Sequence, residues 1–152
     1  MPEKKTIKRA RRDKAQGKAP STQAGEFVRE EIEHIREGKH GARSAKQAIA
    51  IGLSKARRAG VKLKPPAKGK TSERTRRSAE REYEQAEHGR THDKPSRKRS
   101  SGITRALKRE GKSAALHKAL SKHARKAAKT RTHAQRSASA KKAARTRSRA
   151  GA

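Results

Sequence analysis

Lysine and arginine dominate the last third of the chain, and the chemistry open to them is phosphate binding. No acidic residue follows Glu110, whereas residues 112–152 hold 13 lysines and arginines. Cations at this density neutralise nucleic-acid phosphates and release the condensed counterions, so binding is favourable and falls steeply with salt. About ten engaged phosphates would give a log–log salt slope on the order of −9 on duplex DNA. The expected contacts in this third are Lys118, Lys122, Arg125, Lys126, Lys129, Lys141, Lys142, Arg145, Arg147 and Arg149.

A second group of cations, formed by Lys55, Arg57 and Arg58, lies near the middle of the chain. We expect it to add to the same phosphate contacts. Because each side chain would contribute only charge neutralisation, single substitutions should matter little and cumulative ones should matter a great deal.

Residues suited to catalysis or metal binding are few and badly spaced. The chain has no cysteine, and its seven histidines form no His-Glu-x-x-His motif. His34 stands at helical spacing from Glu30 and Glu37, an arrangement that is usually a solvated helix face. There is no glycine-rich phosphate loop. The sequence therefore predicts no enzyme, no cofactor, no metal site and no small-molecule substrate.

Sequence-specific reading of bases is also not expected. There is no zinc-finger spacing, no basic-region zipper and no aromatic pair of the RNA-recognition type. Phe27 and Tyr83 are the only aromatic residues besides histidine, which is too few for stacking on single strands.

The overall composition limits how much of the chain can fold. The net charge is +31, and Leu, Ile, Val and Phe together number 14 of 152 residues. Chains with so few large apolar residues and so much charge cannot bury enough surface to offset the entropy of ordering. Nine of the 14 lie between residues 21 and 65. A folded part is therefore expected there.

Two amphipathic helices are predicted within that part. Val28, Ile32 and Ile35 stand at i, i+4 and i+7 in a helix that starts near Thr22 and stops at the following glycines. A second helix should run from the N-cap Ser44 to Arg58. A helical hairpin would bury both apolar stripes.

Further helices are predicted over 72–88, 104–109 and 113–129, the first of them with little reason to pack. Residues 113–145 are expected to be disordered or frayed when free and helical on DNA, because alanine favours helix once the charges are neutralised. The fold class is thus mainly α, a small helical hairpin with further loosely packed helices and disordered basic termini. The segments are a disordered basic arm at 1–20, the hairpin at 21–66, a charged helix at 67–89, a linker at 90–101, a basic helical segment at 102–130 and a disordered cationic tail at 131–152.

The segment from Lys46 to Arg57 reads Lys-Gln-Ala-Ile-Ala-Ile-Gly-Leu-Ser-Lys-Ala-Arg and follows a basic, glycine-containing segment at 38–43. It resembles the core of a family of small, basic, uncharacterised bacterial proteins, some of which are labelled DNA-binding. The resemblance implies a bacterial, cytoplasmic protein. The tail resembles the Lys/Ala-rich extensions of histone-like proteins.

Together these features predict a nucleoid-associated or architectural protein that binds DNA without sequence specificity by phosphate neutralisation. An RNA-binding or ribosome-associated protein would use the same electrostatics and stays open. So does a protein-interaction module, in which Phe27, Ile32 and Leu53 of the hairpin dock a partner and the charge is a tether. No apolar run is long enough for a signal peptide or a membrane span, so no membrane insertion is expected.

Overall fold

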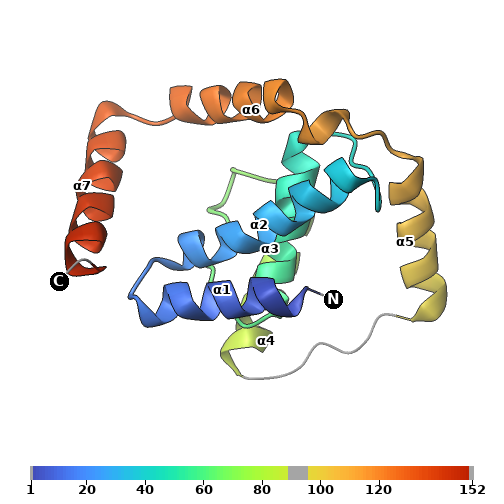
Figure 1. The fold of residues 1–152 in the computed structure, drawn as a ribbon, viewed down its shortest axis with the longest axis horizontal. Helices are drawn as coiled ribbons and strands as arrows, with labels where there is room; N and C mark the ends of the chain where they lie inside the picture. Colours follow the sequence, from blue (N-terminus) through green and yellow to red (C-terminus); the bar gives the residue numbers. More distant parts are fainter. Residues whose placement is uncertain (1, 89–95, 151–152) are drawn as a thin grey trace.

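The computed structural model describes residues 2–88 and 96–150, and in these residues the chain is helical, without a β-strand (Figure 1). The prediction of a mainly α protein is confirmed. Helices α1 to α4 form a bundle, and α5, α6 and α7 come one after another around it as an open arch. The elements are α1 (Lys4–Ala15), α2 (Pro20–Glu37), α3 (Ala45–Arg58), α4 (Glu73–Glu87), α5 (Arg97–Arg109), the 3-10 turn η1 (Ser113–Ala115), α6 (His117–Lys129) and α7 (His133–Ala150).

Helices α2 and α3 pack against each other as the predicted hairpin. Gly38 ends α2 in the left-handed conformation, at φ 80°, which glycine adopts without steric cost. The Ser44 hydroxyl begins α3 by accepting a hydrogen bond from the backbone N–H of Gln47 at 3.2 Å. The two helices touch where Gly52 faces Val28. A Cβ on Gly52 would lie 2.6 Å from the Val28 Cα, so the absence of a side chain sets how closely the helices approach.

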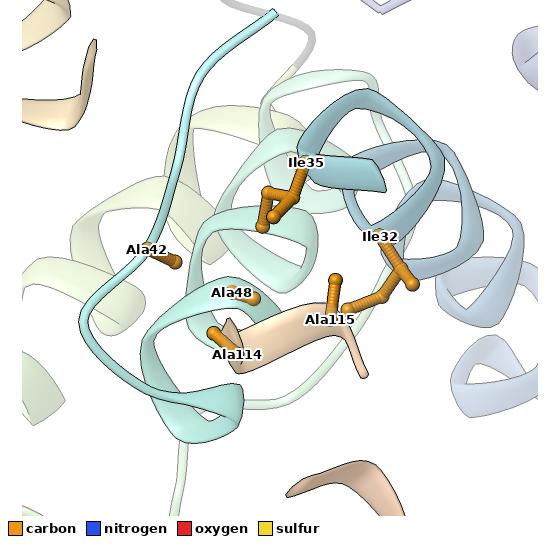
Figure 2. Close-up of a cluster of buried hydrophobic side chains, with 6 residues drawn as sticks. All are labelled: Ile32, Ile35, Ala42, Ala48, Ala114 and Ala115. Atoms are coloured by element: carbon orange, nitrogen blue, oxygen red, sulfur yellow. The ribbon is translucent and has the colours of Figure 1, made fainter. Parts of the chain in front are cut away.

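The side chains buried by this hairpin form two cores, one toward each end of α2. The first, which we call the α1 core, consists of Ala10, Ala24, Phe27, Ala56 and Val61. The second, which we call the η1 core, consists of Ile32, Ile35, Ala42, Ala48, Ala114 and Ala115 (Figure 2).

The α1 core corrects the prediction of a disordered arm at 1–20. Residues 4–15 form α1, which packs against α2. Ala10 and Thr6 are almost fully buried on its inner face, and Lys18 bonds the buried Asp13 at 2.8 Å. Small side chains are enough to pack α1 against α2, because they let the two helix backbones approach closely.

The η1 core joins a segment late in the chain to the hairpin. Ala114 and Ala115 are 3% and 0% exposed, and Figure 2 shows them beside Ala48 and Ile32. Backbone bonds from Gly41 N–H to the Leu107 carbonyl (2.9 Å) and from Ala42 N–H to the Gly111 carbonyl (3.2 Å) reinforce the contact. The helix predicted over 113–129 is divided in the structure. The turn η1 is followed by extended backbone at Leu116, and α6 begins only after that residue.

This packing also corrects the placement of a protein-docking face on the hairpin. Phe27 and Ile32 are 1% and 7% exposed, because α1 covers the first and η1 the second. Neither side chain is available to a partner. Leu53 is half-buried against the α1 core.

Helix α4 packs on α3, contrary to the expectation that it has little reason to pack. Ala79 is buried, and the Ser54 hydroxyl donates a 2.6 Å hydrogen bond to Glu82. Polar contacts thus replace the large apolar side chains that α4 lacks.

The remaining helices contact the bundle less. Helix α5 begins at Arg97, so part of the predicted linker at 90–101 is helical, while residues 90–95 lie outside the described residues. The predicted disordered tail at 131–152 contains α7, which packs against no other element in the part of the chain that the structure describes. Of the helices in the described ranges 2–88 and 96–150, none combines the length and apolar character that a bilayer crossing requires.

Candidate nucleic-acid interface

Helix α6 carries five cations along one face. At 3.6 residues per turn, these five positions fall within an arc of roughly 100°. All five side chains are exposed, so their charges face solvent. The opposite face holds Leu120, which packs against the η1 core and thereby orients the helix. The cations are Lys118, Lys122, Arg125, Lys126 and Lys129.

Helix α7 carries cations on two opposite sides. Lys141, Arg145 and Arg149 stand at i, i+4 and i+8 with Lys142 beside them, and Arg147 lies across the helix from that row. All five are exposed. The helix starts with a reciprocal cap, in which Thr132 Oγ1 accepts from the Gln135 N–H (3.2 Å) and Gln135 Oε1 accepts from the Thr132 N–H (3.1 Å).

Sequence reasoning did not select two further cationic faces. One lies on α5 and the other on the solvent side of α1, each within an arc of roughly 120°. Basic residues spaced by three or four positions were the signal. Because residues 1–20 were interpreted as a disordered arm and residues 90–101 as a linker, no helix face was expected over these segments. The exposed cations are Arg97, Lys98, Arg105, Lys108 and Arg109 on α5 and Lys4, Lys5, Lys8, Arg11 and Arg12 on α1.

Lys55 and Arg57, by contrast, do not belong to the exposed cations, although the sequence predicted them as phosphate contacts. Lys55 Nζ is ion-paired with the buried Glu31 and lies 3.6 Å from the buried Glu30. Arg57 is 7% exposed and donates from Nε to the Leu63 carbonyl at 3.1 Å, and burial lowers the pKa of its guanidinium. Both side chains therefore hold the fold together. Arg58 stays exposed, 3.9 Å from Glu82.

Two acidic residues of α2, Glu30 and Glu31, are buried in the bundle and do not face solvent. Glu30 and Glu31 are 3% and 1% exposed, so Glu30 does not belong to the solvated face predicted for His34, Glu30 and Glu37, whereas Glu37 is exposed. His34 instead bonds Glu3 at 2.9 Å, and this bond, followed by the contact with Lys5, lowers the pKa of Glu3 to about 2. The negative charge of the chain is thus partly buried, and the exposed helix faces are left strongly positive.

Comparison of the chain with protein-family models, with curated proteins and with solved structures gives no significant match.

Proposed function

We propose that this protein binds duplex DNA without sequence specificity, as a nucleoid-associated or architectural protein that neutralises phosphates. The observation that carries the proposal is the exposed cations of α6 and α7, in a stretch of chain without any acidic residue. A net charge of +31 is far larger than the magnitude of roughly 2 to 8 that solubility of a small domain needs.

The two helices suit different parts of a duplex. The one-sided face of α6 matches a single sugar–phosphate strand, along which all five cations can point the same way. Helix α7 has cations on opposite sides, and a helix of about 10–12 Å diameter lying in a major groove of about 12 Å has phosphates on both walls. Such a fit favours B-form DNA over A-form RNA, whose major groove is deep and narrow.

A salt series on three full-length proteins tests the proposal. In the first variant, five of the six cations of α7 are replaced by glutamine: Lys141, Lys142, Arg145, Arg147 and Arg149. The matched control makes five Lys→Gln changes at exposed positions away from α6 and α7: Lys46, Lys62, Lys64, Lys68 and Lys70.

We expect the log–log salt slope on duplex DNA to become shallower by about 4 to 5 in the α7 variant, since each lost phosphate contact contributes about 0.9. The control should retain most of the wild-type slope. Equal effects in both variants would mean that net charge alone governs binding, and negligible affinity at physiological salt would end the proposal. Duplex RNA of the same length, measured in parallel, should bind more weakly.

A further inference from the structure

Glu31, His34 and His40 come together at the carboxyl end of α2. One ligand atom from each lies within 4.8 Å of the other two. Glu31 and His34 share a face because they stand three residues apart on the helix. The left-handed turn at Gly38 then brings His40 back toward Glu31, so that His40 Nε2 lies 3.2 Å from Glu31 Oε1.

Each imidazole is held through one nitrogen by an oxygen acceptor. His40 Nδ1 lies 3.1 Å from the Gly41 carbonyl, which can only accept, so Nδ1 carries the proton. His34 Nε2 lies 2.9 Å from Oε1 of Glu3, whose low pKa keeps it ionised, so Nε2 donates. Metal-binding histidines have this outer shell, in which a carbonyl or a carboxylate fixes the tautomer and leaves the other nitrogen for the ion.

The contact between the buried Glu31 and His40 lacks a hydrogen bond. Glu31 is 1% exposed, and its Oε1 accepts no hydrogen bond, while Oε2 is ion-paired with Lys55. In neutral His40 the Nε2 lone pair therefore faces a carboxylate oxygen at 3.2 Å. Two facing acceptors repel each other unless a cation or a proton lies between them.

We propose that Glu31, His34 and His40 bind a divalent transition-metal ion, with Zn²⁺ as the best match to two imidazoles and one carboxylate. An ion among three atoms at most 4.8 Å apart lies within about 2.8 Å of each, so shifts under about 1 Å reach zinc bond lengths of about 2.0–2.2 Å. Glu30 and Glu31 both face the single ammonium of Lys55, so the cluster keeps a negative charge that a bound cation can neutralise. His34 and His40 are 14% and 16% exposed, which gives the ion a way in.

The ion would fasten the turn before α3 to α2. That turn also carries the backbone bonds to residues 107 and 111, so the metal would stabilise the contact between the hairpin and the later part of the chain. The fourth coordination position would be filled by water.

The test is titration of the EDTA-treated full-length protein with ZnCl₂ by isothermal calorimetry, and with CoCl₂ by visible absorption. We expect one saturable equivalent of Zn²⁺ and the absorption bands of four-coordinate Co²⁺. His34→Ala and His40→Ala should each weaken Zn²⁺ binding by about 100-fold or more. The matched control is His117→Ala, an exposed histidine on α6, which should bind as the wild type does.

The two histidine variants decide the outcome, because Glu31→Gln also removes the partner of Lys55 and can unfold the protein. Far-UV circular dichroism confirms that each variant is folded. Absence of a saturable equivalent in the wild type, or unchanged binding by His40→Ala, would overturn the proposal and leave an ion-paired cluster that holds only a proton. DNA affinity is measured separately and is expected to be the same in all these variants.

Discussion

At the scale of single residues, lysine has two opposite roles on α3: one lysine faces solvent, and another is paired with buried carboxylates. Lys46 is exposed and Lys55 is inserted among buried carboxylates, although both lie on α3. The sequence predicts that both are cations on a helix. It cannot show which one meets Glu30 and Glu31, because that depends on how α2 and α3 cross.

We predict that Lys55→Met destabilises the protein by about 3–5 kcal/mol, because it leaves two buried carboxylates without their cation. Lys46→Met is the control and should change stability by less than about 0.5 kcal/mol, since the side chain is exposed. Urea unfolding followed by circular dichroism measures both. Equal stabilities would show that water, and not Lys55, compensates these carboxylates.

A second prediction concerns two glycines that differ in their surroundings. A Cβ on Gly41 would lie 1.9 Å from the backbone oxygen of Glu110, so Gly41→Ala must push the two segments apart, at a cost of about 1–3 kcal/mol. Gly25 lies in α2 with no atom within 4 Å of an added Cβ, and Gly25→Ala should stabilise by about 0.5–1 kcal/mol. Thermal melts of the two variants should therefore shift in opposite directions. A Gly41→Ala melt at or above the wild-type temperature would contradict the packing of the turn on residues 107–111.

At the scale of elements, the sequence predicts the helices whose apolar stripes are made of large residues. The Ser44 cap and the extents of α3 and α4 follow from local chemistry alone. The packing of α1 and η1 does not, since α1 buries only the small or polar residues Thr6, Ala10 and Asp13, and η1 buries Ala114 and Ala115. Alanine occupies both buried and exposed positions of helices. Whether it is buried depends on which backbones can approach it.

Helix α7 has no tertiary support in the described structure, and tertiary packing supplies most of the stability of helices in proteins. We predict that its backbone amides exchange with deuterium far faster than those of α2 and α3, and that duplex DNA slows them by neutralising the flanking cations. Hydrogen exchange detected by mass spectrometry, with and without DNA, measures this. Protection of α7 equal to that of α2 without DNA would contradict it.

At the scale of the whole molecule, the folded unit is not the segment that the apolar residues predict. The sequence places it at residues 21–66, whereas the packed structure extends from α1 through α4 and includes η1. The cations of α6 and α7 are exposed, as a phosphate contact requires, and their role in binding stays a prediction. Charge surplus is a property of composition and needs no tertiary contact. The exclusion of Lys55 and Arg57 from the interface, by contrast, depends on tertiary contacts.

We therefore predict different outcomes for two truncations. A chain ending at Thr130 loses α7 but keeps both cores, and should melt at the wild-type temperature. A chain ending at Glu110 also lacks Ala114 and Ala115, which leaves the η1 core open, and should lose at least about 2 kcal/mol of stability. Differential scanning calorimetry of both chains is the measurement. Equal melting temperatures would show that η1 does not support the bundle.

The late position of η1 also determines when the protein can finish folding on the ribosome. Val61 is the last residue of the α1 core, but Ala115 is synthesised roughly 3–10 seconds later at about 5–20 residues per second. During that interval the η1 core lacks Ala114 and Ala115, so Ile32 is not yet covered by η1. Premature termination after the hairpin therefore releases a product with an apolar surface that proteases and chaperones recognise.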